Sequence, residues 1–147
     1  MTFIRPAFEG DFDAIADVWW RSWRHAGVDL DDDIAQEDLR CRIDQEMADG
    51  WRLFVAEKDR DIVGMLALAP REARLDQLFI APERQREGLG GALLDQAKSI
   101  FSDGMTLRTA AANSNAIAFY RAHGFALDRE EGPPQRRRNI VWMRWTP

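Results

Sequence analysis

The chain has 147 residues, of which 46% are hydrophobic and 31% are charged, a composition typical of one globular domain with a buried core. No apolar run approaches the roughly 18 residues that a membrane span needs, and the acidic N-terminal segment lacks the apolar stretch of a secretory signal. A single cysteine and a net charge of −5 favour a cytoplasmic location and argue against a nucleic-acid partner.

Helical and extended patterns alternate through the first half of the chain. Residues 3–5 alternate as a short strand, and apolar residues then recur at the spacing of one helix face. A second helix stops at Gly50, and three runs of strand length follow it. The elements expected here are a strand over 3–5, a helix through Ile15, Val18, Trp19, Ser22 and Trp23, a helix through Leu39, Ile43 and Met47, and strands over 51–57, 62–69 and 74–80.

The second half begins at a glycine-rich turn and continues with the same mixture of elements. The expected elements are a helix with Leu93, Leu94, Ala97, Ile100 and Phe101 on its buried side, a strand over 105–109, a helix over 115–123, and strands over 125–129 and 140–145. No internal repeat, low-complexity tract or linker interrupts the chain. We therefore expect a single α/β domain over residues 1–147.

Three glycines, Gly88, Gly90 and Gly91, fall within four positions at the start of the third predicted helix. Unpaired N–H groups and the helix dipole attract anions there, and glycine leaves room for a phosphate. A P-loop is excluded because no lysine follows the glycines. A Rossmann fingerprint is excluded because Leu93 stands where its third glycine belongs. Two interpretations remain: a pyrophosphate held by backbone amides, or a helix packed closely on the sheet.

Two segments resemble the GNAT superfamily of acyl-CoA-dependent N-acyltransferases. Residues 85–90, Gln-Arg-Glu-Gly-Leu-Gly, match its Gln/Arg-x-x-Gly-x-Gly/Ala signature, and "NSNAIAFYRAHGF" at 113–125 matches its downstream segment. The resemblance implies an α+β fold with a mixed, mostly antiparallel central sheet of about seven strands and about four flanking helices. It also implies that the fourth and fifth strands splay apart, often at a bulge in the fourth.

The resemblance implies a coenzyme A site that uses mainly backbone groups, with acetyl-CoA as co-substrate. The pantetheine arm would pair with the fourth strand about Leu78, Phe79 and Ile80. Asn113 and Ala116 match positions that face the cofactor, although Asn113 is equally well explained as a helix cap. The residues expected around the pyrophosphate are Gln85, Arg86, Glu87, Gly88, Leu89, Gly90 and Gly91.

Tyr120, the only tyrosine, matches the position where the family often has its general acid, which protonates the departing thiolate. Its alternative role is aromatic packing beside Phe119. Asp76 is the only carboxylate of the fourth strand and is the candidate base, with His25 or a water chain as rivals. Strand alternation places Asp76 on the same side as Leu78 and Ile80, unless a bulge intervenes.

The acceptor amine is the least determined part of the expected site. Trp20, Arg24 and His25, near the end of the first helix, are the candidate acceptor residues. Six acids in residues 29–38 favour a cationic acceptor, although a solvated loop with helix-capping residues explains them better. The three arginines at 136–138 favour an anionic acceptor, or they keep an edge connection soluble. We therefore leave the charge of the acceptor open.

Cys41 is expected to be a buried structural thiol, and the two histidines and one cysteine lack the spacing of metal ligands, so no metal is expected. Three functions remain. The first is N-acetylation of a small-molecule amine by direct attack in a ternary complex. The second is acetylation of a protein N-terminus or lysine, and the third is a non-catalytic coenzyme A sensor, against which Tyr120 counts. The resemblance also allows a homodimer, on which no sequence feature decides.

Overall fold

The computed structural model describes residues 2–27, 34–132 and 139–147. Every expected helix and strand is present, with ends that differ by at most about two residues, the usual uncertainty of such boundaries. The main elements are β1 (Thr2–Pro6), α1 (Phe12–Ala26), α2 (Gln36–Ala48), β2 (Arg52–Lys58), β3 (Asp61–Ala69), β4 (Arg74–Ile80), α3 (Leu89–Ile100), β5 (Met105–Ala110), α4 (Ser114–Ala122), β6 (Phe125–Glu131) and β7 (Ile140–Trp145). Short 3-10 helices cover Glu9–Asp11, Pro70–Glu72 and Pro82–Arg84.

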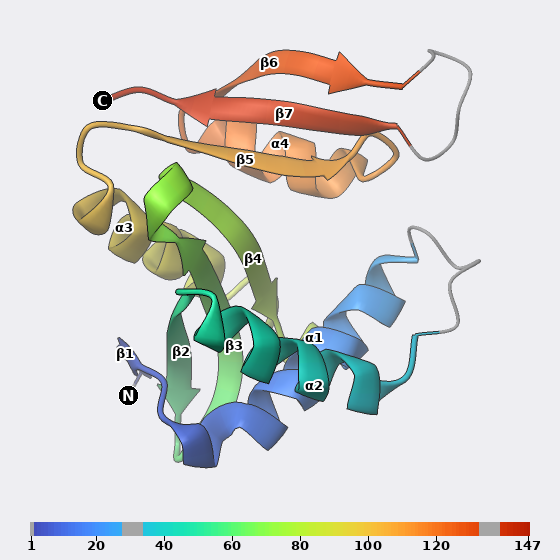
Figure 1. Ribbon diagram of the computed structural model, residues 1–147, viewed down its shortest axis with the longest axis vertical. Helices are drawn as coiled ribbons and strands as arrows, with labels where there is room; N and C mark the ends of the chain where they lie inside the picture. The colour runs from blue at the N-terminus through green and yellow to red at the C-terminus, as the bar shows by residue number, and fades with distance from the viewer. Residues whose placement is uncertain (1, 28–33, 133–138) are drawn as a thin grey trace.

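The strands form one seven-stranded sheet in the order β1-β2-β3-β4-β5-β7-β6. Neighbouring strands are antiparallel except β4 and β5, which run parallel. Figure 1 shows β5, β7 and β6 turned away from β1 to β4, so that the sheet opens between β4 and β5. The expected mixed, mostly antiparallel sheet with a splay between its fourth and fifth strands is confirmed.

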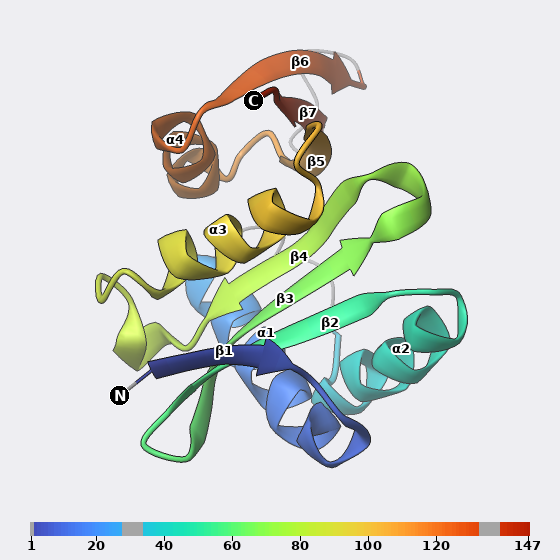
Figure 2. The same ribbon diagram turned by 90° about the vertical axis from the view of Figure 1, so that its left-hand side faces the viewer.

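Helices cover the two faces of the sheet in pairs, and each pair encloses its own apolar core. The α3-side core lies under α3 and α4, and its members include Leu66, Leu75, Leu93, Leu107 and Met143. The α1-side core lies under α1 and α2, and its members include Ile15, Trp19, Ile43, Trp51 and Met65. Figure 2 shows α3 and the α1–α2 pair on opposite sides of β2, β3 and β4. The expected buried faces of the helices are confirmed.

The expectation that Cys41 is buried is wrong, because its side chain is exposed. On α2, Leu39 and Ile43 are buried against the sheet. A residue two positions from Leu39 lies on the opposite side of the helix, so Cys41 points away from the core.

Candidate active site

The splay begins immediately after the first two residues of β4. Parallel pairing joins only Arg74 to Thr106 and Leu75 to Leu107. Beyond these pairs, in the part of the chain that the structure describes, β4 pairs with β3 alone. The other edge of its backbone over Leu78, Phe79 and Ile80 is therefore without a strand partner. An unpaired edge of this kind offers N–H and C=O groups to an extended ligand.

A bulge in β4 lies at the mouth of the splay. Gln77 pairs with Ala67 and Leu75 with Leu68, so Asp76 has no partner on β3. A bulged residue reverses the alternation of side chains along a strand. Asp76 therefore does not share a face with Leu78 and Ile80, because the bulge interrupts the expected alternation. Leu78 and Ile80 pack on the α3-side core, whereas Asp76 points to the opposite face.

Two side chains hold the Asp76 carboxylate in place on that face. The indole Nε1 of Trp51 donates a hydrogen bond of 2.7 Å to Oδ2, and Nε of Arg74 donates one of 2.5 Å to Oδ1. The side chain of Asp76 is 11% exposed, and its hydrogen bond raises the pKa of the Arg74 guanidinium. Each carboxylate oxygen retains a second lone pair. Asp76 is therefore a recessed, ordered acceptor at the point where the strands part.

The turn between β4 and α3 exposes backbone donors. Gly88 is the N-cap of α3, with a left-handed φ of 80°, and Arg86 has a φ of 68°. The amide of Ala92 donates to the carbonyl of Gly88, so by helix geometry the amides of residues 89–91 precede the first intrahelical bond. Figure 2 shows α3 beside β4, with its first turn near the end of β4. The turn has the features of an anion site.

Gly90 and Gly91 have a packing role that differs from that of Gly88. A Cβ on Gly90 would lie 3.1 Å from Cζ of Phe119, and one on Gly91 would lie 3.2 Å from Nε2 of His123. A Cβ on Gly88 would meet no atom within 4 Å. Close packing of α3 against α4 therefore accounts for two of the three glycines, and only Gly88 has open space beside it.

The charges around the turn leave it able to accept an anion. Glu87 forms an ion pair with Lys58 at the end of β2 and lies 4.0 Å from Arg84. Arg86 is exposed, and no described residue forms an ion pair or hydrogen bond with it. The two carboxylates between β4 and α3 are both paired, Glu87 with Lys58 and Glu83 with Arg21. Among the described residues of the turn, the cation without an ion pair is therefore the guanidinium of Arg86.

Tyr120 packs in the α3-side core, together with Leu78 and Leu107 from the two sides of the splay. Tyr120 is 7% exposed, and its ring lies edge-on to Phe119 and Phe125, at centroid distances of 5.3 and 5.5 Å. No hydrogen bond within the described residues engages its hydroxyl, and that oxygen is not among the fully enclosed polar atoms. Burial raises the pKa of Tyr120 above its ordinary value. The hydroxyl is therefore protonated at neutral pH and free to donate.

Asn113 is a helix cap in this structure. Its Oδ1 accepts a hydrogen bond of 3.2 Å from the amide of Ala116, at the start of α4. This contact supports the capping alternative, and both residues are half-buried.

The three candidate acceptor residues share the last two turns of α1 without forming one cluster. The indole Nε1 of Trp20 donates to the carbonyl of Ile34 at 3.1 Å, and the Arg24 guanidinium lies 5.1 Å from the Trp20 ring centroid. His25 is exposed. The segments richest in acids and arginines, 28–33 and 133–138, lie outside the described residues.

Sequence reasoning missed Trp51, Lys58 and Arg74. A signal for Arg74 existed, because it stands two residues before Asp76 on one strand. No local pattern marks Trp51 or Lys58, since each reaches the site from a distant part of the chain.

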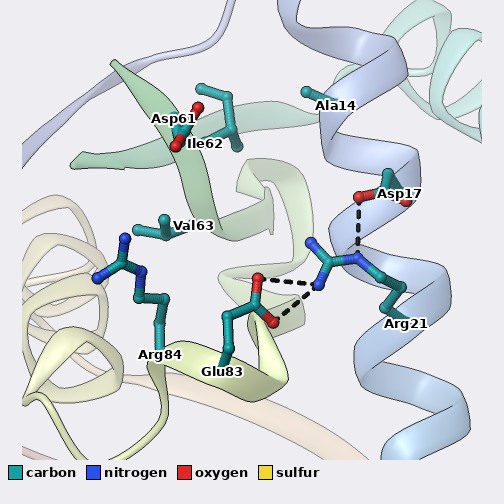
Figure 3. Close-up of a pocket in the computed structure, with 8 residues that line it drawn as sticks. All are labelled: Ala14, Asp17, Arg21, Asp61, Ile62, Val63, Glu83 and Arg84. Carbon is teal, nitrogen blue, oxygen red and sulfur yellow. Dashed lines mark hydrogen bonds and ion pairs between the residues drawn. The ribbon is translucent and has the colours of Figure 1, made fainter. Parts of the chain in front are cut away.

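A separate hollow of about 500 Å³ lies between α1, the start of β3 and the 3-10 helix that follows β4 (Figure 3). Arg21 crosses it, donating to both oxygens of Glu83 at 3.0 and 2.8 Å and to Asp17 at 2.9 Å. Its lining residues are Ala14, Asp17, Arg21, Asp61, Ile62, Val63, Glu83 and Arg84. Neither Asp76, Gly88 nor Tyr120 is among them, so the hollow is distinct from the splay.

No group of three or more His, Cys, Asp or Glu side chains in the described residues is arranged to hold a metal ion. No helix in the same residues has the length and apolarity to cross a membrane.

Comparisons with known proteins agree on one family. Residues 26–146 match the model of the acetyltransferase (GNAT) domain. The chain is 29% identical over 139 residues to a protein of Mycobacterium tuberculosis named "Probable N-acetyltransferase", covering 85% of this chain and 80% of that protein. It is 28% identical over 131 residues to the peptidyl-lysine N-acetyltransferase YjaB of Salmonella typhimurium, covering 86% and 85%. The PaiA N-acetyltransferase of Thermoplasma acidophilum, solved with coenzyme A, superposes with a TM-score of 0.81 at 19% identity over 100% of this chain and 99% of that one.

Proposed function

The chain belongs to the GNAT family of acetyltransferases, and from this membership we propose that it transfers an acetyl group from acetyl-CoA to the primary amine of a small molecule. The observation that carries the proposal is the splay between β4 and β5, which opens beside Tyr120. A thioester is already activated. A neutral amine held against its carbonyl carbon therefore attacks directly, and proximity supplies much of the rate.

The donor is assigned to the splay and the turn that follows β4. The edge of β4 over Leu78, Phe79 and Ile80 has no strand partner in the described residues, which supports strand-like pairing with the amides of the pantetheine arm. The carbonyl of Ile80 also accepts a hydrogen bond of 2.7 Å from Oγ of Ser22. The amides of residues 89–91, the open space beside Gly88 and the guanidinium of Arg86 support binding of the pyrophosphate.

Proton transfers at the two ends of the reaction are assigned to Asp76 and Tyr120. Asp76 accepts a proton from the acceptor ammonium, directly or through water, and leaves the neutral amine. The C–N bond then forms, the nitrogen loses its second proton to water, and the C–S bond breaks when the tetrahedral intermediate collapses. The hydroxyl of Tyr120 donates its proton to the departing sulfur and regains one from water. The role is supported by the fact that no other described residue forms a hydrogen bond with this hydroxyl.

Acetylation of lysine side chains in proteins is the second candidate function. It is favoured by the similarity to YjaB, whose name describes a peptidyl-lysine N-acetyltransferase. The two candidate functions differ in the acceptor that the enzyme binds. A small-molecule enzyme recognises the whole amine, whereas a lysine acetyltransferase also binds the peptide residues on either side of the lysine.

Turnover with matched acceptors separates these two functions. With saturating acetyl-CoA, we expect amino acids and polyamines to give kcat/KM values at least about tenfold above those of lysine-containing peptides, because the site is expected to recognise the whole small molecule. Thiol release measures the rate, and free lysine against the same lysine within a peptide is the matched pair. A higher kcat/KM for the peptides would transfer the assignment to lysine acetylation.

A further inference from the structure

A row of three side chains crosses the last three strands of the sheet. Arg108 of β5 pairs in register with Trp142 of β7, and Trp142 pairs with Arg129 of β6. The guanidinium groups of Arg108 and Arg129 lie 5.7 and 4.7 Å from the Trp142 ring centroid. The indole is thus flanked by two cations, which orders both by cation–π contact.

This row lies on the face of the sheet that α4 does not cover. Leu107 and Met143, the neighbours of Arg108 and Trp142 along their strands, belong to the α3-side core. Successive side chains of a strand point to opposite faces, so Arg108 and Trp142 project from the other face. Figure 1 shows α4 on one side only of β5, β7 and β6.

The row begins at the mouth of the splay, across from Asp76. The last residues that pair between β4 and β5 are Leu75 and Leu107. Asp76 and Arg108 are the next residues on the two strands. Both side chains lie on the face opposite the α3-side core. Arg108 does so by strand alternation, and Asp76 does so because it accepts a hydrogen bond from Trp51 of the α1-side core. A carboxylate and a guanidinium therefore flank the opening from its two sides.

Among the residues paired in register on this face, the arginines Arg108, Arg129 and Arg144 outnumber the one carboxylate, Glu131. Glu131 is engaged, since it accepts from Nε1 of Trp142 at 2.8 Å and pairs with Arg129 at 3.3 Å. Arg108 is exposed, and within the described residues it forms no ion pair. Arg144, which pairs in register with Thr106 on the same face, is likewise exposed and without an ion pair in the described ranges. Arg108 is the member of this group that adjoins the splay.

We propose that Arg108, supported by Trp142, binds a carboxylate of the acceptor, so that the acceptor is an amine that also carries a carboxylate. The inference rests on the proposed function and names its substrate class. The amine end lies toward Asp76, which accepts its proton, and the carboxylate lies against the guanidinium of Arg108. A planar guanidinium on an aromatic ring suits a planar carboxylate, which it binds with two parallel hydrogen bonds.

An amino acid and its amide, equal in length and in their amine, test this assignment. We expect the wild-type enzyme to favour the acid, and Arg108→Gln to lower kcat/KM for the acid by about 10- to 100-fold while changing it by less than about threefold for the amide. Arg108→Lys restores part of the loss, because it keeps the charge without the paired donors. Arg121→Gln is the matched control. It also removes one exposed positive charge, but from α4, which covers the other face of the sheet, so it is expected to leave the preference for the acid unchanged.

The outcomes separate this inference from the function on which it rests. Equal losses for the acid and the amide in Arg108→Gln, or no preference in the wild-type enzyme, would overturn the carboxylate subsite and leave amine acetylation intact. If the enzyme binds acetyl-CoA but acetylates neither compound nor any other amine, both the subsite and the proposed function are wrong.

Discussion

Replacing Tyr120 with phenylalanine is expected to lower kcat by about 100-fold or more, with little change in KM for acetyl-CoA. The substitution removes one oxygen and keeps the ring that packs edge-on against Phe119 and Phe125. A hydrogen bond to the departing sulfur strengthens as charge develops there, so it acts on the transition state more than on the bound donor. Steady-state kinetics at saturating acceptor, with thiol release as the signal, gives both constants.

A second substitution and a second donor separate this role from packing. Tyr120→Leu removes the ring as well as the hydroxyl, so a purely structural role predicts loss in Tyr120→Leu and near-normal turnover in Tyr120→Phe. An acyl donor whose thiol is more acidic needs less help in departing. The loss caused by Tyr120→Phe is therefore expected to shrink with that donor. Full turnover of Tyr120→Phe in a chemistry-limited step would leave the hydroxyl without a catalytic role.

Substitution of Gly88 by aspartate is expected to weaken acetyl-CoA binding by at least about 30-fold relative to substitution by asparagine. Both side chains tolerate the left-handed backbone of Gly88 better than most residues, and both enter the same open space. They differ mainly in one negative charge. At about 5 Å from a phosphate, that charge costs roughly 2–3 kcal/mol in a medium of intermediate dielectric constant.

Calorimetric titration of the two Gly88 variants measures this difference, and their unliganded thermal midpoints check that both fold equally well. In the wild-type protein, acetyl-CoA at a hundredfold excess over Kd is expected to stabilise the fold by about 2.7 kcal/mol. The asparagine variant should keep most of that stabilisation. Equal affinity of the aspartate and asparagine variants would mean that the pyrophosphate does not lie at this turn.

Periodicity and glycine placement made most of the fold predictable. The run at 51–57 alternates and the run at 62–69 is apolar throughout, so both predict strands from local pattern alone. The packing of Gly90 and Gly91 was not decided by the sequence, because their neighbours Phe119 and His123 come from another helix. Close packing accounts for Gly90 and Gly91, and the anion interpretation stays a prediction that concerns Gly88.

The orientation of Asp76 could not be predicted from the sequence, because it depends on how β4 pairs with β3. A one-residue bulge opposite Ala67 and Leu68 turns the carboxylate from one face of the sheet to the other, and no residue type marks it. Its partner Trp51 is 25 positions away. The row of Arg108, Trp142 and Arg129 likewise appears only when β5, β7 and β6 are aligned. The exposure of Cys41, in contrast, follows from helical spacing alone.

Direct transfer in a ternary complex is tested most directly by mass spectrometry of the protein and the acceptor during turnover with acetyl-CoA. Direct transfer predicts that thiol appears only when an amine is present, that each thiol is matched by one acetylated amine, and that the mass of the protein stays unchanged. Exposed Cys41 is the residue to examine for a covalent intermediate. An acetylated protein that forms without acceptor and passes its acetyl group to an amine added later would contradict direct transfer.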